Sequence, residues 1–184
     1  MLRFSIIILM LNFYTPTFSF SKEKIISQME AINILSFDFI QMTDGKKETG
    51  SCIIKYPKKI YCEYNNYNKK IIISNGRSLV IKNKNSISSY KYSLKKTPLE
   101  FLLDKDYLIS KIRNLEPKKI DNKFFVFKIF ENDNDISIFF DLNTFILTGW
   151  QTEDIYQNLI ITYISSIKIN QNIDSKIFIL PKNN

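Results

Sequence analysis

The chain contains few side chains that could carry out covalent or metal chemistry. Its 184 residues include no histidine and only two cysteines, Cys52 and Cys62. The lack of histidine excludes Ser-His-Asp and Cys-His catalysis and His-ligated zinc, and two cysteines cannot form a four-thiolate metal site. There is also no Walker loop and no GxGxxG motif. An enzyme would have to use carboxylates or lysines alone, and no paired arrangement of either is visible. We therefore expect a protein that is not an enzyme and has no metal and no cofactor.

Both cysteines lie in a predicted β-hairpin over residues 50–64. Because side chains alternate between the two faces of a strand, one face of the hairpin is apolar and the other carries lysines. The apolar positions are Cys52, Ile54, Tyr56, Ile60, Cys62 and Tyr64. Pro57 has no amide donor and is expected at the turn. This places Cys52 and Cys62 close to cross-strand register and predicts a disulfide. Free thiols are the alternative, because a register error of two residues would separate the Cα atoms too far.

The amino terminus, residues 1–20, has the layout of a secretory signal peptide. Arg3 supplies a short basic region, and the apolar stretch over residues 4–14 is too short to span a bilayer comfortably. Thr17 and Ser19 stand where a cleavage site prefers small residues. An uncleaved anchor is the alternative. Export would bring the cysteines into an oxidising compartment, where a disulfide can persist.

The rest of the chain, residues 21–184, is predicted to be one domain built mainly from strands. Period-two patterns and turn signals such as Asp44-Gly45 and Asn75-Gly76 recur along it. The expected strands cover 35–41, 50–56, 60–64, 71–73, 79–81, 86–93, 124–130, 136–141, 145–150 and 158–169, and the expected helices begin at Ser21, Thr97 and Tyr107. This pattern favours a large, curved antiparallel sheet of roughly ten strands with a few helices packed on it.

The net charge of +8 does not by itself identify a binding partner. A basic chain can bind nucleic acid, anionic lipid or an acidic protein. Here the lysines are interspersed with acids and asparagines and form no dense block. A solvated surface is the simpler interpretation, and no nucleic acid is expected as a partner.

A series of short motifs follows a distinctive order along the chain. The motifs are Phe39-Ile40-Gln41, the strand from Gly50 to Pro57, Asn75-Gly76, Thr97-Pro98-Leu99, Phe139 with Asp141, Leu147 with Trp150 and Asp154, Thr162, and Phe178 with Pro181. Their order resembles that of the LolA family of periplasmic outer-membrane lipoprotein carriers. The resemblance implies an incomplete antiparallel β-barrel covered by short helices, with an apolar concave face for acyl chains. It further implies a monomeric carrier in the periplasm. Such a carrier takes acylated lipoproteins from an inner-membrane ABC transporter and passes them to the outer membrane, where a separate acceptor is possible.

This resemblance also selects candidate lipid-binding residues. They are Phe37, Phe39, Ile54, Tyr56, Ile60 and Tyr64 on the sheet, and Leu99, Leu102 and Leu103 on a helix that would act as a lid. The alternative for these residues is ordinary core packing beneath a fixed helix. Many family members have an arginine immediately before the hairpin proline, and it is thought to hold the lid closed. Tyr56 occupies that position here and offers a single donor, while Lys55 and Lys58 are expected to face away from it.

A second class of function is compatible with the same residues. The chain could be a structural or adaptor protein of the envelope, with a fully packed sheet core and a basic face that docks on anionic lipid or on a partner. An exported hydrolase that uses carboxylates is a third, weaker alternative. Binding of a fluorescent fatty acid would separate the first two classes, because a filled core leaves no room for an acyl chain.

Overall fold

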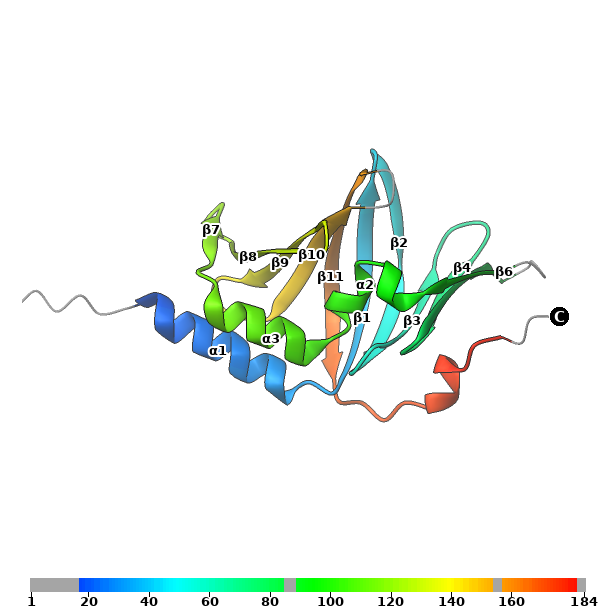
Figure 1. The fold of residues 1–184 in the computed structure, drawn as a ribbon, viewed down its shortest axis with the longest axis horizontal. Helices are drawn as coiled ribbons and strands as arrows, with labels where there is room; N and C mark the ends of the chain where they lie inside the picture. The colour runs from blue at the N-terminus through cyan, green and yellow to red at the C-terminus, as the bar shows by residue number, and fades with distance from the viewer. Residues whose placement is uncertain (1–16, 85–88, 154–156, 182–184) are drawn as a thin grey trace, which may run out of the picture.

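The strands form a single eleven-stranded antiparallel sheet in the computed structural model, which describes residues 17–84, 89–153 and 157–181. They are β1 (Ile34–Thr43), β2 (Lys46–Lys55), β3 (Lys59–Tyr64), β4 (Lys70–Asn75), β5 (Ser78–Asn83), β6 (Ser89–Ser93), β7 (Lys118–Ile120), β8 (Phe124–Glu131), β9 (Asn134–Asp141), β10 (Leu147–Glu153) and β11 (Leu159–Ile169). Their order across the sheet is β6-β5-β4-β3-β2-β1-β11-β10-β9-β8-β7. Strands β6 and β7 are the two edge strands and do not pair with each other, so the curved sheet is not closed into a barrel (Figure 1). The predicted fold class is confirmed.

The helices cover one side of the sheet. They are α1 (Thr17–Ala31), α2 (Leu99–Leu102) and α3 (Lys105–Asn114). The chain also forms two short 3-10 turns, η1 (Leu94–Lys96), which precedes α2, and η2 (Ser175–Phe178), which lies near the carboxyl end. Helices α1 and α3 pack against each other beside β8–β10, whereas α2 crosses in front of β1 and β2 (Figure 1). Asp104 is the N-cap of α3: its side chain accepts a hydrogen bond from the Tyr107 amide at 3.1 Å.

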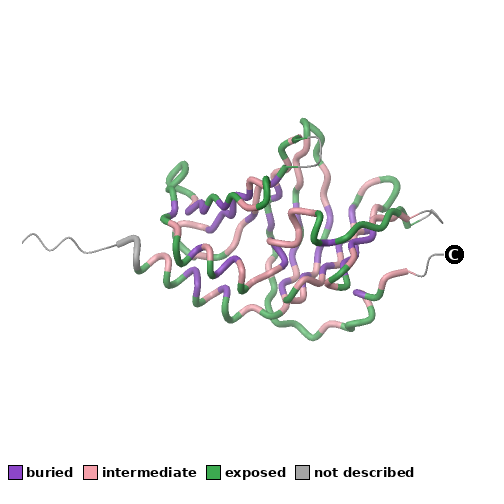
Figure 2. The backbone as a smooth tube through the Cα atoms, viewed as in Figure 1, coloured by how far each residue is buried: buried purple, intermediate pink, exposed green. Residues whose placement is uncertain are grey.

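Two apolar cores lie between the helices and the sheet (Figure 2). The first joins α1 and α3 to the β8–β9 hairpin, and its fully enclosed side chains include Ile25, Ile112, Phe127, Ile136 and Phe140. The second joins β1–β3 to the segment that runs from η1 to the end of α2, and it includes Leu35, Phe37, Phe39, Ile54, Ile60, Leu94 and Leu103. The sheet half with β1–β6 therefore has less helical cover than the half with β8–β10.

Several element boundaries differ from the expected ones. Helix α1 already includes Thr17, the first residue that the structure describes, and so extends further toward the amino terminus than the expected start at Ser21. Thr97 does not cap α2, because its hydroxyl donates to the Leu94 carbonyl at 2.8 Å, and the helix starts only at Leu99. The β8–β9 turn is shorter than expected, since Asn132 and Asp133 both adopt positive φ (48° and 60°) and close it in two residues. Strand β7 was not predicted at all.

Three expectations concern, wholly or partly, residues that the structure does not describe. Residues 1–16 of the predicted signal peptide, residues 86–88 of the strand expected over 86–93, and Asp154 lie outside the described part of the chain. The carboxyl-terminal stretch from 173 to 181 holds η2, which contacts β3 and β4. Within the ranges that the structure describes, no helix is long and apolar enough to span a membrane.

Candidate functional site

A cavity of about 440 Å³ lies between the concave side of the sheet and the segment from η1 to α2. Its apolar wall is made by Phe39, Cys52, Ile60, Cys62, Tyr64, Ile72, Leu79, Ile81, Tyr92, Pro98, Leu99, Leu102, Trp150 and Ile160. Polar side chains at its margin include Gln41, Lys70, Lys96, Thr152 and Thr162. A concave, mostly apolar site with a few polar groups is the usual form of a small-ligand pocket, and the volume is within the range of such pockets.

The wall follows from strand register and from one glycine. Phe39, Gly50 and Tyr64 are direct neighbours on β1, β2 and β3, so their side-chain positions share the concave face. The rings of Phe39 and Tyr64 meet edge to face, with centroids 4.8 Å apart, over the missing side chain of Gly50. A Cβ at position 50 would lie 2.7 Å from Phe39 Cζ. Glycine at this position therefore lets two aromatic rings meet across the strand between them.

The structure brings five of the nine predicted lipid-binding residues to this cavity: Phe39, Ile60, Tyr64, Leu99 and Leu102. Three others, Ile54, Tyr56 and Leu103, border a separate void of about 20 Å³ beneath α2, which Ile60, Leu99 and Leu102 also touch. Phe37 borders neither space; its ring packs against Trp150 with centroids 5.9 Å apart. The void is too small for an acyl chain. These four residues belong to or pack against the apolar core that also contains Phe39 and Ile60, so they lie beside the cavity, on the same side of the sheet.

Sequence reasoning missed most of the far wall, which comes from β4, β5 and β6. Cys62, Ile72, Ile81 and Tyr90 are successive partners across β3, β4, β5 and β6, so they share one face of the sheet. The Asn75-Gly76 turn fixes the register of β4 against β5, and extending the alternation from Cys62 through this turn would have identified Ile72 and Ile81. Trp150 has no comparable local signal, since its position depends on pairing between β10, β9 and β11.

A chain of hydrogen bonds lies at one side of the cavity. The Tyr64 hydroxyl donates to Gln41 Oε1 at 3.1 Å, and Gln41 Nε2 donates to Thr162 Oγ1 at 3.2 Å. Lys70 lies 3.8 Å from the Tyr64 ring centroid and forms an ion pair with Glu48 at 2.6 Å. Burial raises the pKa of Tyr64 well above its usual 10, so the phenol stays protonated and donates. These polar groups are therefore satisfied without a ligand.

Cys52 and Cys62 are joined by a disulfide within the cavity wall, with Cα atoms 4.1 Å apart. The two residues are direct partners in the β2–β3 ladder. The bond therefore ties β2 to β3 in the register that places Phe39, Ile60 and Tyr64 on the concave face.

Loss of this disulfide should lower the free energy of unfolding without changing the fold. We expect the Cys52→Ser, Cys62→Ser double variant to be less stable by about 2 kcal/mol, at the low end of the usual range because the closed loop is short. Urea unfolding of the variant, and of the unchanged protein with and without reductant, measures this difference. If reductant leaves the unfolding curve of the unchanged protein where it was, the pair does not contribute as a cross-link.

Lys58 connects the β2–β3 turn to the helical segment over the cavity. Its backbone amide donates to the Leu103 carbonyl at 2.7 Å, and its ammonium lies 2.6 Å from Glu100 Oε1 and 3.2 Å from Asp104 Oδ2. The expectation that Lys58 faces away was wrong, because its φ of 65° places it in the turn, where strand alternation no longer applies. Lys55 does point elsewhere, toward Ser175 Oγ at 2.9 Å.

The hydrogen bond to Glu100 raises the pKa of Lys58 above its usual 10.5, against the lowering effect of partial burial. A lysine whose pKa is higher in the folded state adds stability that is fully present below about pH 10.5 and is lost as the pH rises through the folded value. The contact is therefore intact at neutral pH. By contrast, burial raises the pKa of the Tyr56 phenol to about 12, and its ring borders only the small void.

The described residues hold no group of three or more histidine, cysteine, aspartate or glutamate side chains that could bind a metal ion. The arrangement of an unclosed sheet, an apolar cavity and a helix across it is that of a protein that holds an apolar ligand.

Comparison with known proteins assigns a family to this architecture. The family model described as outer membrane lipoprotein carrier protein LolA matches residues 30–180, so the chain belongs to the LolA family. LolA-like proteins bind lipids or lipoproteins in the cell envelope and are binding or carrier proteins rather than enzymes.

Comparison with solved structures gives matches at low sequence identity. A LolA superfamily protein, NE2245 from Nitrosomonas europaea, is 12% identical with a TM-score of 0.50, covering 90% of this chain and 99% of that one. The Mycobacterium tuberculosis lipoprotein LppX is 12% identical with a TM-score of 0.47, covering 86% and 99%. A chain of the Pseudomonas aeruginosa MucA/MucB complex is 9% identical with a TM-score of 0.45, covering 88% and 61%. A search of curated proteins gave no match.

Proposed function

We propose that the protein is a periplasmic carrier that holds the acyl chains of lipoproteins in the 440 Å³ cavity and moves them from the inner to the outer membrane. The observation that carries this proposal is the apolar wall of the cavity, formed by strands from both halves of the sheet. Exposing an acyl chain to water costs about 0.8 kcal/mol per CH₂ group, so transfer across an aqueous compartment requires a protein that keeps the chain dry.

The size of the cavity bears on how much of the cargo fits. One liquid water occupies about 30 Å³, so the cavity has room for on the order of fifteen groups of that size. That is enough for one acyl chain and too little for the several chains of a lipoprotein anchor. Binding of further chains would be aided by movement of the segment from Pro98 to Leu103 away from the sheet, and Lys58 joins this segment to the β2–β3 turn through its ion pair with Glu100.

The proposed partners follow from this role: acylated lipoproteins as cargo, an inner-membrane ABC transporter as the donor, and an outer-membrane acceptor or the membrane itself as the recipient. The direct test supplies the purified protein to spheroplasts that contain its own transporter. We expect release of lipoprotein in a soluble one-to-one complex. Release that does not depend on the added protein would contradict the proposal.

A simpler binding test separates the carrier from an envelope adaptor with a filled core. Saturable binding of a fluorescent fatty acid, displaced by unlabelled fatty acid, is expected of the carrier. Mass spectrometry of lipid that co-purifies with the protein complements this test. A protein that neither binds the probe nor co-purifies with lipid would favour the adaptor.

A further inference from the structure

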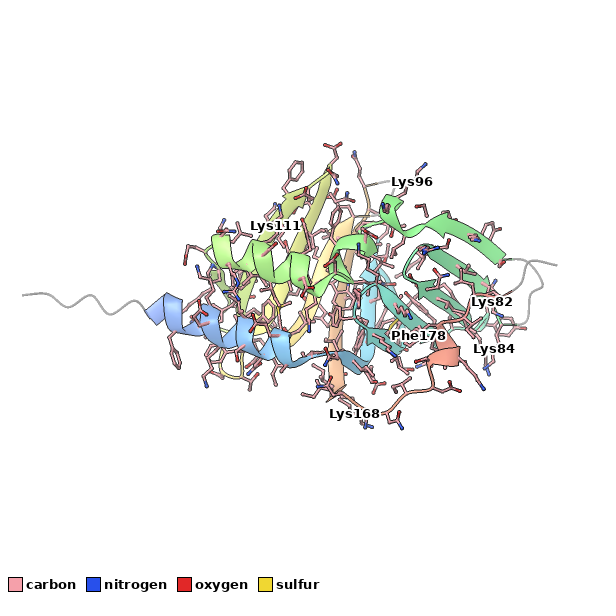
Figure 3. The ribbon with its side chains drawn as sticks, turned by 60° about the horizontal axis from the view of Figure 1, so that its bottom comes forward. Lys82, Lys84, Lys96, Lys111, Lys168 and Phe178 are labelled. Carbon is pink, nitrogen blue, oxygen red and sulfur yellow. A yellow bond between two sulfur atoms is a disulfide. The ribbon has the colours of Figure 1, made fainter. Side chains whose placement is uncertain are left out.

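The positive charge of the chain is concentrated in one part of the fold. Residues 46–96, which form β2–β6 and η1 and are called the basic lobe here, contain thirteen lysines and arginines against two glutamates. The rest of the chain contains thirteen basic and sixteen acidic residues. In Figure 3, Lys82, Lys84 and Lys96 all lie on this side of the molecule, whereas Lys111 lies on α3 at the other side. The net charge of +8 is therefore a property of one lobe.

The lobe cannot neutralise this charge internally. Glu48 is already paired with Lys70 at 2.6 Å, and Glu63 with Lys84 at 3.0 Å. Lys58 is paired with carboxylates of the helical segment. Exposed cations of the lobe are Lys46, Lys47, Lys69, Arg77, Lys84, Lys91, Lys95 and Lys96. They lie on turns, on both ends of the strands and along the edge strand β6, rather than around one shaped pocket.

Exposed tyrosines accompany these cations. Tyr67 in the β3–β4 loop is 97% exposed, and Tyr90 and Tyr92 on β6 are 67% and 47% exposed. Tyr92 and Lys96 also line the cavity, so the exposed aromatic and cationic groups of the lobe reach its mouth. Tyrosine, with an apolar ring and a polar tip, is enriched where a protein meets the membrane–water interface.

We propose that the basic lobe docks on the surface of an anionic lipid bilayer, with β6 and the mouth of the cavity toward the membrane. A bilayer is favoured over an acidic protein because the charges are spread over an extended surface and are interleaved with interfacial tyrosines. Each lysine or arginine close to an anionic membrane adds to the attraction, which acts over about one Debye length and is weakened by salt. Docking would bring the apolar cavity to the place where an amphiphile leaves or enters the lipid.

Vesicle flotation of the purified, unloaded protein tests this surface. We expect binding to phosphatidylcholine vesicles that contain one third phosphatidylglycerol, little binding to phosphatidylcholine alone, and loss of binding at high salt. The Lys91→Glu, Lys95→Glu double variant should bind about 30-fold more weakly. The Tyr90→Ser variant should also bind more weakly, although its charge is unchanged. Neither variant alters a residue that lines the cavity.

The matched control reverses two exposed lysines outside the lobe, Lys118 on β7 and Lys168 on β11. The Lys118→Glu, Lys168→Glu variant has the same net charge as the lobe variant and should retain vesicle binding within about threefold. The proposal would be overturned if both double variants lost vesicle binding equally, or if the protein bound neutral and anionic vesicles equally well. No binding to either vesicle would also overturn it and assign the charge to an acidic protein. Fatty-acid binding by the lobe variant reports separately on the carrier function.

Discussion

Replacing Ile72 with tryptophan is expected to abolish the binding of a fatty acid while leaving the protein folded. Ile72 lies on β4 between Cys62 and Ile81, is only partly buried, and borders the cavity. An indole at this position would extend into space that an acyl chain is proposed to occupy. We expect the affinity for a fluorescent fatty acid to fall by about 100-fold, and the free energy of unfolding to change by less than about 1.5 kcal/mol, because the larger side chain enters empty space rather than a packed core.

The control for this variant is Ile120→Trp. Ile120 is 42% exposed on the edge strand β7 and does not border the cavity, so this change should leave the affinity unaltered. If Ile72→Trp bound the probe as tightly as the unchanged protein, the ligand would lie elsewhere. If it lost several kcal/mol of stability, the space would behave as a filled core, and the adaptor function would be favoured.

Local patterns were sufficient to predict much of the half of the sheet that holds the hairpin. The Asn75-Gly76 turn closes β4 on β5, where the Asn75 side chain accepts hydrogen bonds from the amides of Arg77 and Ser78 at 3.0 Å. The strands on each side of Pro57 pair as the alternation indicates, and Cys52 faces Cys62 directly. These features depend on residues close together in the chain, and for such residues sequence patterns determine register.

Features that depend on distant contacts could not be predicted in the same way. The pairing of β1 with β11 joins residues more than a hundred positions apart, and it is this pairing that brings Thr162 and Gln41 together beside the cavity. Strand β7 has three exposed residues and no alternation, so it is a strand only because β8 offers an edge. The excess of lysine and arginine in residues 46–96 can be counted in the sequence. Only the fold shows that these residues lie together in one part of the sheet.

Lys58 illustrates why alternation fails at turns. Its neighbours on β2 and β3 follow period two, and this rule directs Lys55 away from the cavity side, as observed. At position 58 the left-handed backbone redirects the side chain toward the helical segment, where Glu100 and Asp104 are carboxylate partners. In the family, the corresponding restraint is attributed to an arginine one residue before the proline. We propose that Lys58, one residue after it, fills that role here.

Charge reversal at Lys58 should therefore release the segment over the cavity. In the Lys58→Glu variant, two charge-assisted contacts are lost and a third carboxylate is placed beside Glu100 and Asp104. Because the side chain of Glu100 is only 15% exposed, loss of its partner is costly, although the 30% exposure of Lys58 lets solvent screen part of the effect. We expect the closed arrangement to lose about 3 kcal/mol, roughly 100-fold in its equilibrium with an open one. Stopped-flow release of a bound fluorescent fatty acid measures this change as faster dissociation.

Two further variants show whether the effect arises from this contact. Lys55→Glu makes the same charge change in the same hairpin but away from α2, so dissociation should remain slow. Exchanging the charges in Lys58→Glu, Glu100→Lys should restore slow dissociation to within about tenfold, since the pair is re-formed with opposite polarity while Asp104 remains free to cap α3. Unchanged release in Lys58→Glu would mean that the backbone hydrogen bond from Lys58 to Leu103 holds the segment without help from the side chain. Rapid release in all three variants would mean that dissociation depends on the net charge of the hairpin. In that case the basic lobe would slow dissociation by attracting an anionic ligand.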